Sequence, residues 1–514
     1  MDGAPVKEIQ SGDDGAVDHH GEALPQLSKV AARINVNKIK AARREAKKSG
    51  DHPGVGWFYD FMMGFTNRAF YGQFRTVEIT GIENISEEAG MLTVAWHTNS
   101  LIDPMCIAVT QSKRLIFGGR HDLITRPIIG PIASRMGSQP VIRQAELARG
   151  GTTSEEAALI NGKTMLTLAE CIANGHASAL FPEGTSHEDS KMKRLRTGPM
   201  RSVIAANSIA TERGLPEPHL LPVGLHYRTS WHYRTDAWIE YGKPIHLTEF
   251  IHSKEQRSKL IAGEWVEADA DSVNALRDRV QEELTPLTPD AESWDEHRAW
   301  HLLGHLHGHA HGAPLKSWRE EVLAARDIRN RIREGDSILT EAMESATQIA
   351  CDLNDVGLDG RAFCSTGLRQ PKSSEKLAFI PALFLAILAG PLTTISSGLM
   401  ILAGKILGDK TDEGLDARTT YHVLASLLGP LLIWPIPALL VTIILMTVFS
   451  LTPLITIVIL LITPFAFHLS NLIAMRAWDL HVQSRDARRL QRFSKTKQGI
   501  DAEAAAIKLL AVLK

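Results

Sequence analysis

Two long stretches without a charged residue constrain what this chain can fold into. Residues 377–404 contain no Asp, Glu, Lys or Arg, and neither do residues 421–475. A helix needs roughly 20 apolar residues to cross the hydrocarbon of a bilayer, so the second stretch has room for two helices joined by a tight turn. We therefore predict membrane helices over residues 421–448 and 451–475. A buried helix pair in a soluble protein is the alternative, but such helices rarely run so far without a charge.

The first stretch is interrupted by Gly390 and Pro391 and then by threonines and serines, so it either spans with a kink or forms a shallow re-entrant hairpin. Basic residues flank the membrane region, with Lys372 and Lys376 before it and a dense run over residues 476–497 after it. By the positive-inside tendency both flanks lie in the cytoplasm, which requires an even number of crossings. We expect two crossings, with residues 377–404 re-entrant or interfacial and a basic helical tail over residues 477–514.

Composition excludes several classes of partner. The chain has 514 residues with 56 basic and 58 acidic side chains, so its net charge of −2 gives no general attraction to nucleic acid. Its four cysteines are scattered, without zinc-site or disulfide-framework spacing, which favours a reducing compartment. Residues 1–54 lack an apolar signal segment and predict a polar, disordered tail with a cytoplasmic amino end.

From residue 76 onward, short apolar runs alternate with helical patterns, which is typical of an α/β domain. We predict a mixed sheet with flanking helices over residues 76–250. The predicted strands are residues 77–80, 92–96, 114–117, 140–143, 177–181, 220–225 and 238–241, and the predicted helices are residues 128–136, 154–173 and 199–213.

An aromatic segment over residues 55–75 precedes the domain. Phe58, Phe61, Met62 and Phe65 recur at helical spacing, which predicts an amphipathic helix in the membrane interface. The alternative is a helix that packs on the sheet, because such stripes are often core.

Residues 251–370 are more polar and predict a helical insert, with helices at residues 272–283 and 318–334. Inside it a histidine cluster alternates with Gly304, Gly308 and Gly312, which suggests a loop; the histidines are His301, His305, His307, His309 and His311. Imidazoles at this density can bind zinc or nickel. No cysteine or carboxylate stands at ligand spacing, so we expect no metal site.

The strand over residues 92–96 delivers His97 to its carboxyl end, where ligands of α/β sheets collect. An imidazole can accept a proton from an alcohol near neutral pH, and a carboxylate on its other nitrogen would fix the tautomer. Asp103 is the candidate carboxylate. Because Pro104 follows it, Asp103 is also a candidate helix N-cap, and the two roles are compatible.

A second group of polar residues follows the strand over residues 177–181. The turn Pro182, Glu183, Gly184 and Thr185 can point amides and a hydroxyl at an anion, and cations including Arg196 follow it. An ordinary strand-to-helix turn is the alternative. Arg143, at the end of another strand, could clamp the same phosphate, or could be a solvated strand-end residue.

In order and spacing these segments resemble the glycerophospholipid acyltransferase family. Its blocks are represented by WHTNSLIDP (residues 96–104), GSQPVIR (137–143), FPEGT (181–185) and LLPVGL (220–225), and the resemblance covers roughly residues 57–248. Five residues separate His97 from Asp103, where most of the family has four. This spacing and the carboxyl-terminal membrane segments resemble fungal-type glycerol-3-phosphate and dihydroxyacetone-phosphate acyltransferases.

The resemblance implies an O-acyltransferase that moves an acyl group from acyl-CoA or acyl carrier protein to glycerol 3-phosphate, dihydroxyacetone phosphate or lysophosphatidate. His97 and Asp103 would be catalytic, the acceptor would be held by Asn99, Arg143, Glu183, Gly184, Thr185 and Arg196, and amides near Asn99 or Gly184 would bind the oxyanion. No cofactor is expected beyond the acyl co-substrate. We expect an integral membrane protein that contacts phospholipid, with its catalytic domain on the cytoplasmic face. A lipid transacylase or hydrolase, or a non-catalytic phospholipid-binding scaffold, are the alternatives.

Overall fold

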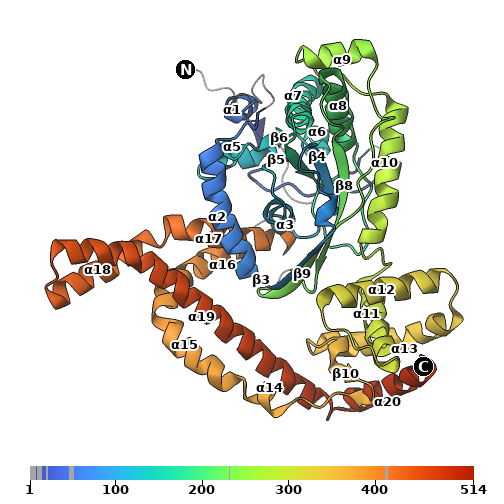
Figure 1. The fold of residues 1–514 in the computed structure, drawn as a ribbon, viewed down its shortest axis with the longest axis vertical. Helices are drawn as coiled ribbons and strands as arrows, with labels where there is room; N and C mark the ends of the chain where they lie inside the picture. Colours follow the sequence, from blue (N-terminus) through green and yellow to red (C-terminus); the bar gives the residue numbers. More distant parts are fainter. Residues whose placement is uncertain (1–6, 9–13, 19–20, 46–50, 231, 411–414) are drawn as a thin grey trace.

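The computed structural model describes residues 7–8, 14–18, 21–45, 51–230, 232–410 and 415–514 (Figure 1). A seven-stranded mixed sheet forms the centre of the upper part, with strand order β3-β9-β8-β4-β7-β5-β6. Only the β8–β9 pair is antiparallel. The strands are β3 (Phe74–Thr80), β4 (Met91–Ala95), β5 (Leu115–Arg120), β6 (Gln139–Val141), β7 (Ala177–Leu180), β8 (His219–Tyr227) and β9 (Thr235–Tyr241). All seven predicted strands and the mixed α/β class are confirmed.

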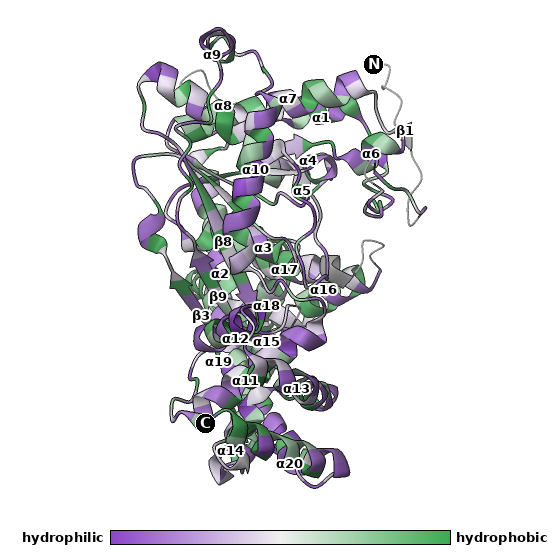
Figure 2. Cartoon of the chain, turned by 90° about the vertical axis from the view of Figure 1, so that its right-hand side faces the viewer, coloured by the Kyte–Doolittle hydropathy of each residue, from purple (hydrophilic) through white to green (hydrophobic). Residues whose placement is uncertain are grey.

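Helices cover both faces of the sheet. Alternate residues of β4 point to opposite faces, so Leu92 and Val94 pack on one side while Met91 and Ala95 pack on the other. The first side is covered by α7 (Ser154–Ala173), α8 (Gly198–Arg213), α9 (Lys254–Ile261) and α10 (Ala270–Leu284). The second is covered by α2 (Gly56–Gln73) and α3 (Ile102–Thr110). In Figure 2, β8 is mainly green, whereas α10 alternates purple and green as an amphipathic helix does.

Three short helices lie between β5 and α7, namely α4 (His121–Thr125), α5 (Ile129–Arg135) and α6 (Gln144–Ala148). The helices predicted at residues 128–136, 154–173 and 199–213 are confirmed as α5, α7 and α8.

The prediction of a disordered tail is wrong for residues 14–18 and 21–45. Leu27, Ile34 and Ile39 are buried, and Ile39 packs with Ile124 and Ile160 of the domain. The segment forms β1 (Lys7–Glu8), β2 (Arg33–Ile34) and α1 (Val36–Ala42). Only a few apolar residues, widely spaced among polar ones, make these packing contacts. The polar composition of the segment therefore does not predict them.

Helix α2 combines the two interpretations of the aromatic segment. Met62 and Phe70 are buried in the domain, whereas Trp57, Phe61 and Tyr71 are exposed. One face therefore packs on the sheet domain, and the other presents aromatic side chains outward.

The polar insert divides differently from the predicted boundary at residue 250. Helices α9 and α10 bury Leu260 and Leu276 in the core that covers the sheet, so they belong to the sheet domain. A separate helical bundle begins at α11 (Trp294–Ala310) and continues through α12 (Trp318–Arg333) and α13 (Ser337–Asp355). The helices predicted at residues 272–283 and 318–334 are confirmed as α10 and α12.

The histidine-rich segment is helical rather than a loop. His301 and His305 lie on α11, and the glycines among the histidines serve close packing. A Cβ at Gly304 would lie 3.0 Å from the Ala324 side chain of α12, and one at Gly308 would lie 2.7 Å from the Ala313 carbonyl. Glycine here allows segments to approach α11 closely, which outweighs its low helix propensity.

The first apolar stretch is one continuous helical run, not a hairpin. It comprises α14 (Ser373–Leu377), α15 (Phe379–Thr393), a π turn η4 (Thr394–Gly398) and α16 (Leu399–Asp409). The second stretch is α17 (Leu415–Leu432), α18 (Pro435–Phe449) and α19 (Pro453–Phe493). The α17–α18 pair is bent by 42°, so the span predicted at residues 421–448 is broken at Pro435, which cannot continue the hydrogen-bonding of a helix interior.

By length and composition, two helical runs of the described chain could cross a membrane, Ser373–Asp409 and Pro453–Phe493, and the bent pair would make a third. Their apolar side chains are widely exposed, including Phe384, Ile387 and Phe465. The basic flanks of the membrane region lie side by side, because the Ser484 hydroxyl donates to the Lys376 carbonyl at 2.8 Å.

The basic tail is not a separate element. Leu490 and Phe493 at the end of α19, and Leu509 of α20 (Lys497–Val512), are buried in the bundle formed by α11 and α13. The end of the chain therefore completes the core of the helical insert.

Candidate active site

His97 follows β4 at the carboxyl edge of the sheet, and its ring bonds to Asp103. The His97 Nδ1 and Asp103 Oδ2 atoms are 2.8 Å apart, and the Asp103 side chain is fully buried. The five intervening residues fit because Ser100 adopts a positive φ of 39°, which turns the chain sharply before α3 begins. The longer spacing therefore preserves the pair.

The Asp103 carboxylate is held by four donors. Besides His97, the backbone amides of Thr98 and Asn99 donate to Oδ2 at 2.9 and 2.8 Å, and the Tyr227 hydroxyl donates to Oδ1 at 2.7 Å. Burial, helped by the nearby Asp103 charge, raises the pKa of Tyr227 well above its ordinary value, so the phenol stays a donor. Asp103 lies inside the first turn of α3 rather than at its N-cap, so the N-cap role is not observed.

The His97 ring lies over Phe181, with the ring centroids 4.2 Å apart and the planes nearly parallel. Its side chain is 18% exposed, and its Nε2 atom has no hydrogen-bond partner in the part of the chain that the structure describes. The orientation leaves one nitrogen available to a substrate while the other is fixed by a carboxylate, as general-base catalysis requires.

Glu183 joins the FPEGT turn to the histidine loop. One of its oxygens accepts from the His97 amide at 2.8 Å, and the other accepts from the Lys193 amide at 2.7 Å and contacts His187 Nε2 at 2.5 Å. Its side chain is fully buried. Both oxygens of Glu183, which was predicted to hold the acceptor, are engaged within the protein, and this carboxylate positions the turn beside His97.

The rest of the turn is accessible. Gly184 has a φ of 76°, is exposed, and has its amide bonded to the Phe181 carbonyl. Thr185 is half-buried, and among the described residues its amide has no hydrogen-bond acceptor. The predicted oxyanion donors, the amides of Asn99 and Gly184, are both engaged within the protein, whereas the amide of Thr185 is unengaged among the described residues.

The two predicted phosphate-binding arginines lie near the turn, but each is paired with a carboxylate. Arg196 Nη1 donates to Asp18 at 2.8 Å and to the Gln144 side chain at 3.2 Å. Arg143 donates through Nε to buried Glu146 at 2.8 Å. Gln144, which follows Arg143 in the chain, thus brings the two arginines close together. Asp18 of the amino-terminal segment pairs with Arg196, the more exposed of the two.

Asn99 is buried and serves as a junction rather than as a surface that faces substrate. Its side-chain amide donates to the Ser230 carbonyl, and its Oδ1 accepts from the Thr419 hydroxyl at 3.1 Å. The Leu101 amide also donates to Thr420 at 3.4 Å. The histidine loop, the β8–β9 connection and helix α17 of the membrane region therefore meet at one side chain.

Sequence reasoning missed several residues of this site. Tyr227 stands two positions beyond the fourth block, where the apolar strand gives no reason to single out one phenol. Phe181 was seen as part of the FPEGT block but not as the ring under His97. Nothing local marks Thr419, because it lies 320 positions from Asn99.

Comparisons with known proteins agree with this geometry. Residues 76–226 match the family model described as Acyltransferase. An uncharacterised acyltransferase of Schizosaccharomyces pombe is 32% identical over 95 residues, covering 18% of this chain and 14% of that protein. Glycerol-3-phosphate O-acyltransferase 1 of Saccharomyces cerevisiae is 24% identical over 161 residues, covering 31% of this chain and 19% of that protein. The chain thus spans less than a fifth of the length of either relative.

Among solved structures, the chain is similar to the 1-acyl-sn-glycerophosphate acyltransferase PlsC of Thermotoga maritima, with 18% identity and a TM-score of 0.29 over 44% of this chain and 78% of that one. The matched residues 76–226 enclose His97, Asp103 and the FPEGT turn. The chain therefore carries, over residues 76–226, a domain that matches the Acyltransferase family model.

Proposed function

We propose that this protein transfers an acyl group from a thioester to a hydroxyl of a phosphorylated glycerol, and that His97 is its general base. The observation that carries the proposal is the His97–Asp103 pair, with one ring nitrogen bonded to a buried carboxylate and the other unengaged among the described residues. A scaffold that only binds lipid has no need of a base prepared in this way.

In the proposed reaction His97 Nε2 takes the proton of the acceptor hydroxyl, and the alkoxide attacks the thioester carbonyl. The tetrahedral intermediate collapses with cleavage of the carbon–sulfur bond, and the His97 proton passes to the thiolate that leaves. The Thr185 amide is our candidate donor to the oxyanion, because it is free within the described chain and belongs to the turn that Glu183 holds beside His97.

For the acceptor we propose glycerol 3-phosphate, supported by the name of the yeast relative, with dihydroxyacetone phosphate and lysophosphatidate as the other candidates. Arg196 is the proposed phosphate ligand, because its side chain is 33% exposed and its Cγ lies 3.5 Å from where a Gly184 Cβ would stand. Arg143 is more enclosed, at 15% exposure, and bound to Glu146, so we assign it to the wall of the acceptor site. The acyl donor is acyl-CoA or acyl carrier protein.

We further propose that the catalytic domain rests on the cytoplasmic face of a membrane. Helix α17 packs against α2 and α3, which places the membrane region beside the catalytic loop, and α2 exposes Trp57 and Phe61 outward. The basic flanks of the membrane region lie together, as the positive-inside tendency requires of one cytoplasmic end.

The same packing supports two crossings, the bent α17–α18 pair outward and α19 back. The run Ser373–Asp409 begins beside Ser484 in the basic flank and ends at α16, which packs on α17 beside the catalytic motif. Both ends of this run therefore lie with the cytoplasmic parts.

The test is acyl transfer by the purified full-length chain in lipid, with glycerol 3-phosphate, dihydroxyacetone phosphate and lysophosphatidate supplied in parallel. His97→Ala should remove a factor of about 10² or more of the rate, as loss of a general base does. His246→Ala, which removes an exposed histidine of the same domain, is the matched control and should leave the rate unchanged. Equal rates for His97→Ala and the parent protein, or no transfer to any acceptor, would reject the proposal.

A further inference from the structure

A large cavity separates the sheet domain from the helical insert. Its volume is about 920 Å³, and it lies between β8–β9, the bundle helices α11 to α13 and the basic half of α19. Trp96 and Thr98, the two sequence neighbours of His97, line it, but His97 and Asp103 do not. We call it the interlobe cavity; it lies next to the catalytic motif and is distinct from it.

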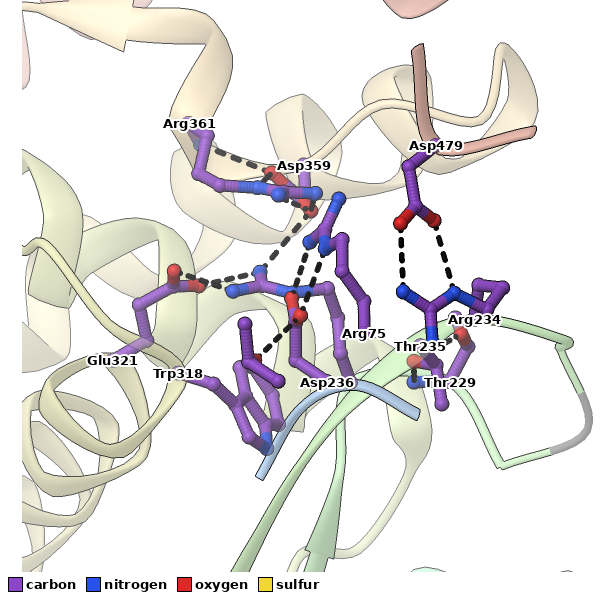
Figure 3. Close-up of polar contacts among 12 residues, drawn as sticks. Arg75, Thr229, Arg234, Thr235, Asp236, Trp318, Glu321, Asp359, Arg361 and Asp479 are labelled. Atoms are coloured by element: carbon purple, nitrogen blue, oxygen red, sulfur yellow. Dashed lines mark hydrogen bonds and ion pairs between the residues drawn. The ribbon is translucent and has the colours of Figure 1, made fainter. Parts of the chain in front are cut away.

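Ion pairs hold one wall of the interlobe cavity together (Figure 3). Arg228 bonds to Asp236 of β9 at 2.8 Å and to Glu321 of α12 at 2.6 Å, and Arg234 bonds to Asp479 of α19 at 2.6 Å. These contacts join the sheet domain, the insert and the end of the membrane helix. They account for Asp236, Glu321 and Asp479 as structural partners of arginines.

The lining as a whole is positively charged. Nine arginines line it against five carboxylates, and three more carboxylates directly behind the lining, Asp236, Glu240 and Asp295, pair with lining arginines, which leaves an excess of one positive charge before any histidine is counted. The arginines are Arg75, Arg228, Arg234, Arg298, Arg326, Arg329, Arg361, Arg485 and Arg489, and the acidic residues are Glu188, Glu321, Asp359, Asp479 and Asp486.

Arg329 carries a buried charge without a carboxylate of its own. It is 4% exposed and donates to the carbonyls of Thr288, Pro289 and Pro286 at 2.8, 3.1 and 3.4 Å and to Asn330 Oδ1 at 3.2 Å, all of which are neutral acceptors. Within the described chain no carboxylate lies at ion-pair distance from it, and Asp290, which acts on its charge, is bound to Arg333. Burial and the charges of Arg333 and Arg326 lower the pKa of Arg329 to about 10. A buried cation in this setting favours an anion beside it.

Three polar atoms on the same lining have no hydrogen-bond partner among the residues that the structure describes. Buried and unbonded are the indole Nε1 of Trp300, the Nδ1 of His297 and the Nε2 of His301, and the whole Trp300 side chain is only 3% exposed. Burial lowers the pKa of both histidines, so each is neutral and can donate one hydrogen bond. Arg329 lies close enough to contribute to the lowered pKa of His297. Water can satisfy these atoms, but it leaves the charge of Arg329 uncompensated.

We propose that the interlobe cavity binds a small phosphate-bearing ligand, whose phosphate accepts hydrogen bonds from Arg329, the Trp300 indole and the neighbouring histidines. Phosphate suits the site because it offers several strong acceptor oxygens to donors on different side chains of the same lining. The ligand is a nucleotide-type phosphate, a phosphorylated glycerol or free phosphate, and the chemistry that recognises all three is the same.

The test is calorimetric titration of the full-length protein in detergent with three probes: inorganic phosphate, glycerol 3-phosphate and adenosine 3′,5′-bisphosphate. Saturable binding of at least one probe is expected, and the order of affinities identifies the source. Preference for the bisphosphate points to a nucleotide, and preference for glycerol 3-phosphate points to a phosphorylated glycerol. If inorganic phosphate binds as tightly as the other two probes, the ligand is free phosphate.

Variants assign the binding to the cavity. Arg329→Gln should weaken Kd about tenfold or more, and Trp300→Phe, which keeps the ring and removes only an N–H, should weaken it a few-fold. Arg298→Gln is the matched control, because Arg298 also lines the cavity but is paired with Asp295 at 2.6 Å; it should change Kd less than twofold. His97→Ala should bind as the parent protein does.

Several outcomes would overturn the proposal. They are the absence of binding by every probe, an unchanged Kd in both Arg329→Gln and Trp300→Phe, or a loss of binding in Arg196→Gln that matches its loss of acceptor use. Thermal unfolding of each variant checks folding, and Trp300→Phe keeps the test decisive if Arg329→Gln does not fold. Because His97→Ala retains the cavity, failure of the proposed acyl transfer and failure of this site are separate results.

Discussion

The hydroxyl of Thr419, on a helix of the membrane region, donates a hydrogen bond to Asn99 Oδ1, two residues after His97 in the catalytic loop. The amide of the same Asn99 donates to the Asp103 carboxylate that orients His97. A residue outside the matched acyltransferase segment thus helps to set the position of the base.

Thr419→Val should lower kcat about tenfold with little change in KM, because it keeps the volume and leaves a buried amide oxygen without this donor. Thr419→Ser, which restores a hydroxyl, should recover most of the rate. Thr442→Val is the control within the membrane region, because that hydroxyl bonds only to its own helix, at the Ala438 carbonyl. Steady-state kinetics of the three variants in the same lipid would decide; equal losses in Thr419→Val and Thr442→Val would mean a general effect on folding.

The Asp103 carboxylate should matter more than the phenol that supports it. Asp103→Asn cannot stabilise the imidazolium and favours the wrong tautomer, so we expect a loss of about a hundredfold or more in kcat. Tyr227→Phe removes one neutral donor at 2.7 Å from Asp103 and should cost about tenfold at most. Comparison of kcat in the two variants checks this ranking, and a larger loss in Tyr227→Phe would contradict it.

The amino-terminal segment should compete with the acceptor for Arg196. Asp18 has a fully buried side chain and bonds to Arg196 at 2.8 Å, so its carboxylate stands where the proposed phosphate would bind. Asp18→Asn removes the competing charge and should lower the acceptor KM several-fold, whereas Arg196→Gln should raise it. Donor KM, measured alongside, should stay constant in both. A higher acceptor KM in Asp18→Asn together with a lower one in Arg196→Gln would show that Arg196 does not belong to the acceptor site.

Acid should weaken the ion pairs that Asp236 makes with Arg75 and Arg228 within the sheet domain, beside the joint with the insert. Burial alone would raise the pKa of Asp236, but hydrogen bonds from Arg75 and the charges of Arg228 and Arg75 lower it to about 2. A lowered folded-state pKa stabilises the protein above the unfolded pKa of about 3.8, and this stabilisation disappears as pH falls toward 2. It amounts to about 2 kcal/mol.

Asp236→Asn should therefore be less stable than the parent protein at pH 6 and should lose less stability between pH 4 and pH 2. Thermal unfolding across this range measures the difference. Arg277→Gln, at a half-buried helix residue paired with its neighbour Asp278, is a suitable control. Parallel pH curves for the parent and Asp236→Asn proteins would contradict the assignment.

Periodic patterns in the sequence predicted the sheet domain well. All seven strands and the helices α5, α7 and α8 follow from local apolar alternation, because each element buries a face that the chain itself displays. His97, Asp103 and the FPEGT turn were also identifiable, since short motifs place their residues at adjoining strand ends. The direct contact of Glu183 with the His97 amide could not be predicted, because it joins segments 86 positions apart.

The errors have a common physical origin in long-range packing. Gly304 and Gly308 suggested a loop, whereas their missing side chains allow α12 and the segment after α11 to lie against α11. Leu27 and Ile39 stand among polar residues in the sequence, although Leu27 packs with Ala145 and Ile39 with Ile124 of the sheet domain. No sequence motif surrounds Asp18 or Thr419, because their importance comes only from contacts with residues that are distant in the sequence.

Helix α19 is a single helix of 41 residues, roughly 60 Å long at the rise of an α-helix. Its first half is apolar and outward-facing, and its second half carries Asp479 on the cavity wall and Phe493 in the bundle core. In the proposed membrane arrangement, any tilt that the bilayer thickness imposes on residues 453–475 also displaces Asp479 and Phe493, because all of them belong to the same helix.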